Sequence, residues 1–493
     1  MRIATTITLV ALSACAEPVL TRPAPAPLPP TPGSYELRLG LISDSQLQTL
    51  KAPGQIAFLR RRLDDHLVAV ALRPPAVDIA GRFMMEAQLE HLSDSEIIIY
   101  TGDAANNGCE DEITEAFEVL SAFRSRTRVP LFFVIGNHDY LGAGNTSNLN
   151  HRNPLCGEGN RPLTKLDLIR RAHAFNQENL PLLGVGSSFV DSFSELTVAS
   201  CENANAGRGI DPQDQHLKPG CFLSGVISLE NGEQILLLDS SDYADVEHRP
   251  TEFRRLTRAE FAGLRGSVSF HDSTSQGEWL RKHMPAIAPK IRIIASHYNL
   301  DGMRWNLLLF KPGTLVGIPS QYLNPEPELG NHWVYGHTHT AQPTTDLYDP
   351  ALKYCRQGIC EAALHEEVNV GSTTDWWPHS AIAYVGRSTT VVPFYLGEKC
   401  GTFMDLIKKE AANAGRRYGI VNGHEHGIVL FGLDRSYQQY RDGERDRVAA
   451  YNNARLLAAE AITAGHAATL SDAWVCLGFV GSWYERVGGR PRL

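Results

Sequence analysis

The most regular pattern along the chain is a short hydrophobic run followed directly by polar residues. Runs of this length that are rich in Ile, Val and Phe are typical of strands buried on both faces of a sheet. Stretches with helix-like spacing lie between several of these runs, for example at 110–124 and 276–283. The pattern predicts an α/β fold, in which ligand sites form at the carboxyl ends of strands. The predicted strands are Leu37–Ser43, Ile97–Tyr100, Leu131–Ile135, Ile291–Ala295 and Trp333–Tyr335.

The start of the chain has the features of an export signal. One positive charge at Arg2 precedes a short apolar run that ends in Leu12-Ser13-Ala14-Cys15. This run is too short to cross a bilayer as a stable helix. Its end resembles a bacterial lipobox, which implies cleavage before Cys15 and lipidation of Cys15. A plain secretory signal, in which Cys15 is incidental, is the alternative.

The expected location is the bacterial cell envelope, with the protein facing the periplasm or the cell exterior. Ala16, rather than Asp, follows the cysteine, and this favours the outer membrane. Seven prolines between residues 16 and 33 predict an extended stalk, because proline at that density prevents a packed element. No later segment has eighteen uninterrupted apolar residues. We therefore expect membrane contact only through the N-terminal lipid.

Composition and charge are those of an ordinary globular chain. Of the 493 residues, 43% are hydrophobic and 20% are charged, which excludes a largely disordered or coiled-coil protein. The 46 basic and 55 acidic residues give a formal charge of −9. A nucleic-acid scaffold usually presents a basic face, so we expect no such role here.

The cysteines predict a disulfide framework. There are nine, and the eight that remain after Cys15 form an even set, which in an exported chain favours disulfides. No Cys-x-x-Cys motif occurs, so a zinc ribbon or a thioredoxin-like site finds no support. Short loops favour Cys201–Cys221 and Cys355–Cys360. Proximity along the chain suggests the pairs Cys109–Cys156, Cys201–Cys221, Cys355–Cys360 and Cys400–Cys476.

The polar residues that follow the predicted strands are of types that bind divalent metals. Asp, Asn and neutral His are ligands for Mn, Fe and Zn. Two neighbouring cations need a bridging carboxylate and separate ligands for each, and such a pair binds phosphate oxygens and activates water. The glycines beside these residues permit sharp turns. The motifs are Asp44-Ser45-Gln46, Gly102 to Gly108, Gly136 to Asp139, His297, and Gly336 to His339.

This ordered set of motifs resembles the calcineurin-like metallophosphoesterase family. The family pattern is Asp-x-His, Gly-Asp-x-x-(Asp/Asn)-x-Gly, Gly-Asn-His-(Asp/Glu), a lone His after a strand, and Gly-His-x-His. Four of the five blocks match in order, each behind a predicted strand. The resemblance covers about residues 35–395. It implies a four-layer sandwich of two mixed β-sheets flanked by helices.

The resemblance also implies two divalent metal ions (Mn, Fe or Zn) and their ligands. Gln46 stands where the family usually has His, and its carbonyl is a weaker donor than imidazole, so we expect the first metal to bind less tightly. A second Gly-His-x-His at residues 423–426 is not needed to complete the set. The implied ligands are Asp44, Gln46 and His339 for the first metal, Asn137, His297 and His337 for the second, and Asp103 as the bridge.

Catalytic and substrate-binding roles are expected beside these ligands. The resemblance implies that His138 protonates the leaving oxygen or stabilises the phosphoryl charge, and we expect Asp139 to orient its imidazole. Asn106 is a predicted substrate contact. Asp375 and Trp376 are predicted to line the rim of the site, since a Trp can stack on a base or a sugar. The alternative for Trp376 is that it fills the core.

Four segments are predicted along the chain. Within the third segment (35–397), about residues 140–235 are rich in Gly, Asn and Pro, which predicts an insertion of long loops over the site. After this insertion, Gln234–Asp239 resumes a strand. The last segment (398–493) contains helix-like stretches at 402–416 and 437–464. We expect it either to pack on the core or to contact a partner. The segments are a lipoprotein signal peptide (1–14), a Pro-rich tether (15–34), the metallophosphoesterase domain (35–397) and a mainly helical C-terminal extension (398–493).

The sequence as a whole predicts an exported, lipid-anchored phosphohydrolase that cleaves phosphate esters with metal-activated water. The expected substrate is a small phosphorylated molecule, with a phosphomonoester or nucleotide favoured. One alternative is a phosphodiesterase or nuclease on the same fold, although the acidic charge disfavours extended nucleic acid. The other is a non-catalytic, disulfide-braced surface binding protein with a degenerate metal site. No feature identifies a protein partner.

Overall fold

The structure is a computed structural model of the full chain. Among the predicted features, the signal with Cys15, the cysteines at 156, 355 and 360, the helix-like stretch at 402–416, and all of the stretch 437–464 except residues 459, 462 and 463 lie outside the residues that it describes. Within the described part, no helix is both long enough and apolar enough to span a membrane. The structure describes residues 26–47, 75–106, 108–140, 161, 163–198, 200–201, 221–242, 266, 268–269, 273–287, 290–299, 331–337, 344–348, 365–374, 378–386, 389–396, 400, 459, 462–463, 465, 469 and 471–477.

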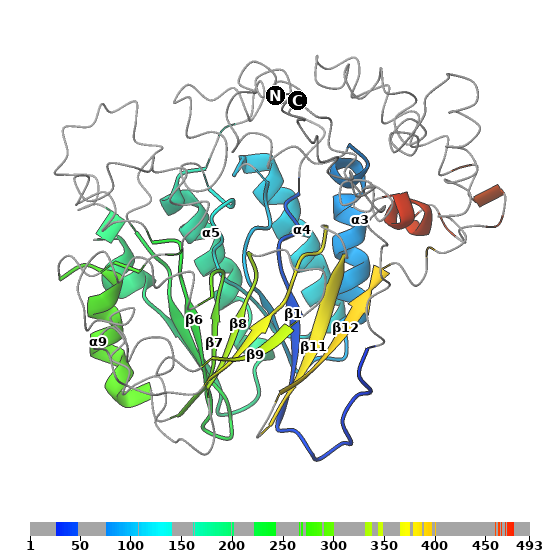
Figure 1. The fold of residues 1–493 in the computed structure, drawn as a ribbon. Coiled ribbons are helices and arrows are strands. Elements are labelled where there is room, and N and C mark those ends of the chain that lie inside the picture. The colour runs from blue at the N-terminus through cyan, green and yellow to red at the C-terminus, as the bar shows by residue number, and fades with distance from the viewer. Residues whose placement is uncertain are drawn as a thin grey trace, which may run out of the picture.

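Two mixed β-sheets form the framework of the fold (Figure 1). The first sheet has the order β12-β11-β1-β2-β3. Its neighbours β1, β2 and β3 pair in parallel, whereas β11 pairs antiparallel with both β1 and β12. Its strands are β1 (Leu37–Ile42), β2 (Ile97–Tyr100), β3 (Leu131–Phe133), β11 (His379–Val385) and β12 (Thr389–Tyr395).

The second sheet has the order β4-β5-β6-β7-β8-β10-β9. Its central strands β6, β7, β8 and β10 pair in parallel, and the outer pairs are antiparallel. The parallel strands of both sheets include all five that the hydrophobic runs predict. The strands are β4 (Ser188–Asp191), β5 (Gly225–Ser228), β6 (Gln234–Leu238), β7 (Ile291–Ser296), β8 (Asn331–Tyr335), β9 (Thr344–Tyr348) and β10 (His365–Asn369).

Alternate residues of the first sheet face two different cores. Leu39 and Ile99 belong to a cluster that also contains Ile235 and Ile293 of the second sheet, so these side chains fill the space between the sheets. Ile98 points the other way, into a cluster built with the helices. Because successive side chains of a strand point to opposite faces, a strand buried on both faces must be hydrophobic at every position. This explains the uninterrupted apolar runs and confirms the predicted α/β sandwich.

Helices flank both sheets. Three of them pack on the outer face of the first sheet, where Met85 of α3, Ile113 of α4 and Leu168 of α5 join the same cluster as Ile98. Helix α9 lies on the flank of the second sheet (Figure 1). The helices are α3 (Pro75–His91), α4 (Glu110–Thr127), α5 (Lys165–Gln177) and α9 (Gln276–Ile287).

Helix α5 and the turn after it complete the edge of the first sheet. The side chain of Asn176 accepts from Phe133 N and donates to Phe133 O, at 2.8 and 3.0 Å. Asn179 does the same for Leu131, at 2.8 and 2.7 Å. Two amide side chains thus take the place of a neighbouring strand. They pair backbone N–H and C=O groups of the edge strand β3 that would otherwise lack partners.

The prediction of a loop-rich insertion at about 140–235 is wrong for the part that the structure describes. This part contains α5, the 3₁₀ turn η2 (Leu180–Leu182), β4, the π-helical turn η3 (Phe193–Thr197) and β5. The Gly, Asn and Pro content of the segment is an average over its turns and its regular elements, so it does not reveal the helix and strands within the segment. The apolar positions within α5, at Leu168, Ile169, Ala172 and Phe175, have helical spacing and are buried.

Residues 471–477 pack on the body of the protein. Residues 471–477 are helical, and Trp474 stacks on Phe83 of α3 with ring centroids 5.9 Å apart. The disulfide Cys400–Cys476 joins this segment to the residues after β12. Together with Cys201–Cys221, two of the predicted pairs are confirmed. Cys109 is also disulfide-bonded. The packing favours the first of the two predicted roles for the extension.

Candidate metal centre

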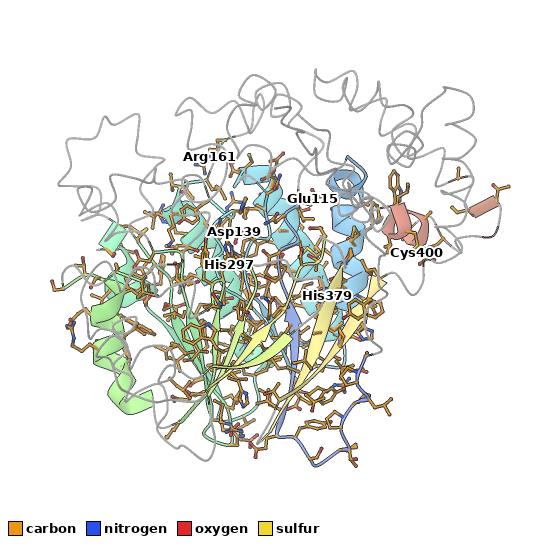
Figure 2. All side chains as sticks on the ribbon, viewed as in Figure 1. Glu115, Asp139, Arg161, His297, His379 and Cys400 are labelled. Atoms are coloured by element: carbon orange, nitrogen blue, oxygen red, sulfur yellow. A yellow bond between two sulfur atoms is a disulfide. The ribbon has the colours of Figure 1, made fainter. Side chains whose placement is uncertain are left out.

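The predicted metal ligands that the structure describes lie where the carboxyl ends of the two sheets meet. The loops after β1 and β2 stay paired beyond the strands, because Asp44 N donates to Gly102 O (3.0 Å) and Gln46 N donates to Asp103 O (2.9 Å). Asp139 and His297, from the loops after β3 and β7, lie close together at the same end of the sheets (Figure 2). The fold therefore brings together residues from four strand ends of two sheets.

Backbone strain is concentrated at this place. In the described part of the chain, five residues other than glycine have a positive φ. One is Arg128, which caps the end of α4. The left-handed region costs a residue with a side chain on the order of 1 kcal/mol and persists where the surroundings enforce it, often at functional sites. The other four are predicted ligands: Asp44 (52°), Gln46 (42°), Asp103 (58°) and His337 (65°).

The buried carboxylate of Asp103 is the centre of the group. Its Oδ2 lies 3.1 Å from Gln46 Nε2 and 3.3 Å from His297 Nε2. Its Oδ1 accepts from His138 N at 2.8 Å. Ligand atoms of Asp103, His297 and His337 all lie within 4.8 Å of one another. One carboxylate with partners on several sides is the arrangement that a bridging ligand requires.

His297 presents one nitrogen to this group. Its Nδ1 lies 2.8 Å from Thr101 O, and since a carbonyl only accepts, Nδ1 carries the proton. Its Nε2 lies 2.9 Å from Asn137 Oδ1 and faces Asp103. A backbone carbonyl that holds the far nitrogen is the usual support of a metal-binding imidazole. Carboxylate, amide oxygen and imidazole together fit a divalent cation such as Mn, Fe or Zn.

The charges of the group depend on one another. Burial alone lowers the pKa of His297, but the charge and hydrogen bond of Asp103 outweigh it and raise that pKa to about 9. Burial raises the pKa of Asp103, but His297 and His138 hold it well below its ordinary value. Without a cation, Asp103 and His297 therefore form a buried ion pair. A cation takes over the positive charge and requires the neutral imidazole.

Asp44 is held by backbone and hydroxyl groups from distant segments. Its Oδ2 accepts from His337 N at 3.0 Å, which ties the loop after β1 to the loop after β8. Its carbonyl oxygen accepts from Ser372 Oγ (3.0 Å) and Thr374 Oγ1 (3.2 Å). This bracing role was not predicted from the sequence. The signal that could have indicated it is the Ser-Thr-Thr run at residues 372–374, which follows β10.

The role predicted for Asp139 is wrong in its geometry. Its carboxylate accepts from three backbone amides, those of Gly136 (2.8 Å), Asp103 (2.9 Å) and Ala105 (3.1 Å). Burial and the nearby charge of Asp103 raise the pKa of Asp139 to about 7. The carboxylate of Asp139 joins the loops after β2 and β3, because backbone amides of both loops lie within hydrogen-bonding distance of it. It does not orient His138.

The imidazole of His138 is held instead by Asn106. Nδ1 of His138 lies 2.7 Å from the carbonyl oxygen of Asn106. The side chain of Asn106 is buried, so its predicted contact with substrate stays a prediction. His138 is partly exposed, with Nε2 as its remaining ring nitrogen. Predicted site residues outside the described part of the chain are Cys15, His339, Asp375 and Trp376, as well as the second Gly-His-x-His at 423–426.

Two glycines allow the loops to approach this closely. A Cβ at Gly136 would collide with the backbone and carboxylate of Asp103. A Cβ at Gly336 would collide with Ser43 and the carboxylate of Asp44. The glycines of the Gly-Asn-His-Asp and Gly-His-x-His motifs are thus required by contact with the ligands.

Comparison with known proteins gives the following matches. The family model described as calcineurin-like phosphoesterase matches residues 37–341. Among solved structures, the chain is similar to a dimetal phosphatase from Danio rerio, with 13% identity and a TM-score of 0.38, over 73% of this chain and 99% of that chain. No curated protein matches.

Proposed function

The chain belongs to the calcineurin-like phosphoesterase family, and on this premise we propose that it is an exported, lipid-anchored phosphohydrolase of small phosphomonoesters or nucleotides. Membership makes it a metal-dependent phosphoester hydrolase, and the family implies two divalent metal ions and a small phosphorylated substrate. The observation that carries the proposal is the convergence of Asp103, His297 and His337 within 4.8 Å at the junction of the two sheets.

The proposed ligand assignment combines the geometry of this group with the family pattern. Asp103 would bridge the two metals, because its carboxylate lies at the centre of the group, with Gln46 and His297 beside it. Asn137, His297 and His337 would hold one metal, and Asp44 would hold the other with His339, which lies outside the described residues. Gln46 presents its amide nitrogen to Asp103 and stabilises the charge of that carboxylate. When bound, a metal pair supplies Lewis acidity to phosphate oxygens and lowers the pKa of a water molecule.

His138 is the proposed proton donor. The carbonyl oxygen of Asn106 accepts from Nδ1, so in a ring protonated on both nitrogens the proton to be donated would be the one on Nε2. A positioned imidazole of this kind can protonate the leaving oxygen of a phosphate ester. The backbone amide of His138 donates to Asp103, which keeps the ring beside the bridging carboxylate.

The preference for a small substrate is supported by charge. The formal charge of −9 opposes binding of an extended polyanion, which depends on basic residues that neutralise phosphates. A phosphodiesterase of the same family is the competing assignment.

The membrane anchor rests on Leu12-Ser13-Ala14-Cys15 and the Pro-rich residues that follow. We expect Cys15→Ser to move the protein from the membrane fraction to the soluble fraction and to abolish incorporation of labelled fatty acid. Labelled fatty acid on the Cys15→Ser protein would contradict the anchor, and the catalytic assignment would stand.

The catalytic assignment is tested with purified full-length protein. Metal content is measured by mass spectrometry, and hydrolysis of an aryl phosphate monoester and diester is measured with added Mn²⁺. We expect close to two metals per chain, faster turnover of the monoester, and loss of turnover in Asp103→Asn.

The matched control is Asp191→Asn, which alters another nearly buried carboxylate that contacts an imidazole, His173 Nδ1 at 2.7 Å. This variant should keep metal and turnover. Preferred diester cleavage would make the protein a phosphodiesterase. A wild-type protein with neither metal nor turnover would leave the non-catalytic binding role.

A further inference from the structure

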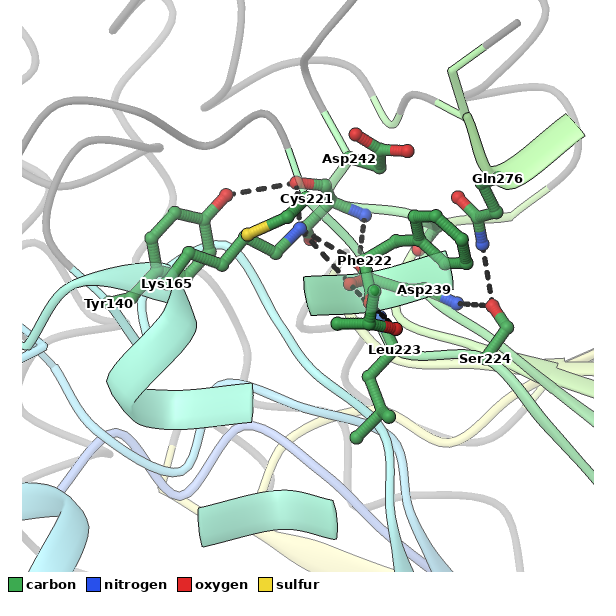
Figure 3. A network of polar contacts seen from close by, with 12 residues as sticks. Tyr140, Lys165, Cys221, Phe222, Leu223, Ser224, Asp239, Asp242 and Gln276 are labelled. Atoms are coloured by element: carbon green, nitrogen blue, oxygen red, sulfur yellow. Dashed lines mark hydrogen bonds and ion pairs between the residues drawn. The ribbon is translucent and has the colours of Figure 1, made fainter. Parts of the chain in front are cut away.

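A fully buried ion pair lies beside the metal centre. Lys165 Nζ is 3.0 Å from an Asp239 carboxylate oxygen, and both side chains have no exposed surface (Figure 3). Removal of two charges from water is costly, and apolar side chains of similar volume often stabilise a core as well. Lys165 is also the first residue of α5, where a positive charge opposes the helix dipole. An ion pair that is costly to bury and that places a positive charge at a helix start indicates a role other than stability.

The ion pair closes the loop that follows β6. Lys165 Nζ donates to Ser241 O at 2.7 Å. Asp239 accepts from Ser241 N at 2.9 Å and from Leu223 N at 3.1 Å. The loop of residues 239–242 is therefore held at its backbone by groups that no solvent reaches.

The same loop is joined to the first sheet. Tyr140 OH donates to Ser241 O at 2.9 Å, and the Tyr140 ring lies 5.2 Å from Lys165 Nζ (Figure 3). Tyr140 directly follows the Gly-Asn-His-Asp motif, which carries Asn137 and His138. Since β3 belongs to the first sheet and β6 to the second, this contact joins loops of both sheets.

The loop also holds the backbone of a predicted ligand. Ser240 Oγ accepts from His297 N at 3.1 Å and from Tyr298 N at 3.0 Å. On the other side of the centre, His297 Nε2 lies 2.9 Å from Asn137 Oδ1. Loop 239–242 is thus in contact with both segments that supply these two ligands.

We infer that Lys165, Asp239 and Tyr140 are positioning residues for the metal centre. They fix loop 239–242, and Ser240 on that loop sets the backbone from which His297 meets Asn137. The inference rests on the proposed function, because it assumes that these two residues bind metal. Residues that orient metal ligands commonly change metal affinity by about 10-fold to 100-fold when they are altered.

The test measures Mn²⁺ binding to the full-length, metal-free protein by calorimetry, together with its melting temperature. Asp239→Asn removes the charge pair, and Tyr140→Phe removes only one hydroxyl and keeps the pair. We expect both variants to bind Mn²⁺ at least about 10-fold more weakly than the wild type. If Asp239→Asn does not fold, the result with Tyr140→Phe decides.

Thr389→Val is the matched control. Thr389 Oγ1 lies 2.7 Å from His332 Nδ1 and joins β12 to β8, so it also links the two sheets through a buried hydrogen bond, but at the start of both strands. This variant should lower the melting temperature and leave Mn²⁺ affinity within about twofold of the wild type.

Two results would overturn the inference and leave the proposed function in place. Wild-type affinity in Tyr140→Phe, or an equal loss of affinity in Thr389→Val at equal loss of melting temperature, would mean that the network only stabilises the fold. A wild-type protein that binds no Mn²⁺ would instead overturn the proposed function, and the inference with it.

Discussion

Asn137 Oδ1, from the loop after β3 of the first sheet, lies 2.9 Å from His297 Nε2, which follows β7 of the second sheet. Neither sheet alone contains both residues. The centre therefore exists only when the two sheets are packed, with the buried cluster of Leu39, Ile99, Ile235 and Ile293 between them. Chemistry at this site is coupled to the integrity of the core.

Replacement of His138 should slow chemistry and leave metal binding intact. We expect His138→Asn to reduce turnover of aryl phosphates by about 10²-fold to 10⁴-fold, the usual contribution of a general acid. The loss should be larger for phenyl phosphate than for nitrophenyl phosphate, because the poorer leaving group needs the proton more. His283→Asn, which alters a partly exposed histidine next to Glu195, is the control. An equal loss for both substrates would speak against proton donation.

The stability of the metal-free protein should fall as the pH rises toward 9. Although burial opposes it, Asp103 raises the pKa of His297 to about 9 in the folded state, above the ordinary value of 6.5. A group with a raised folded-state pKa stabilises fully below its unfolded pKa, and this contribution is lost as the pH rises through the folded pKa. Denaturant titrations between pH 6 and 10 should show a decline that is absent in His297→Asn. The same slope in both proteins would refute the ion pair.

A methyl group at Gly136 should disrupt the bridging carboxylate. The added Cβ of Gly136→Ala meets the backbone and side chain of Asp103, which can relieve the clash only by moving. We expect a loss of about 1–3 kcal/mol in the free energy of unfolding and a large drop in Mn²⁺ affinity. Gly184→Ala serves as the control, because the nearest atom to its Cβ is 3.7 Å away. Unchanged Mn²⁺ binding in Gly136→Ala would contradict the central position of Asp103.

Removal of the Cys400–Cys476 disulfide should affect stability but not metal binding. This bond closes a segment with a sequence separation of 76 and attaches the helical residues 471–477, whose Trp474 stacks on Phe83. A native disulfide of this kind typically contributes about 2–4 kcal/mol. The double variant Cys400→Ser and Cys476→Ser should therefore melt at a lower temperature under oxidising conditions and bind Mn²⁺ normally. Lost Mn²⁺ binding would assign this segment a part in the site.

The sequence alone determined the strand ends and the residue types of the centre. Uninterrupted apolar runs followed by Asp, Asn, His and Gly are local features, and the parallel strands that they predict must end at the same edge of a sheet. The pattern is therefore sufficient to place Asp103 and Asn137 at one edge of a sheet, whereas His297 follows a strand of the second sheet and was grouped with them only through the family resemblance. The short loop between Cys201 and Cys221 also made the disulfide between them predictable from the sequence.

Only the tertiary structure decided how these residues are held. Asp139 binds three backbone amides and Asn106 orients His138, because the loops after β2 and β3 fold against each other. The pairing of Lys165 with Asp239 joins residues 74 positions apart, on α5 and in the loop after β6, and no local pattern encodes it. Hydrophobic periodicity reports only which face of an element is buried. The partner of a buried polar group depends on which loops the packed sheets bring into contact.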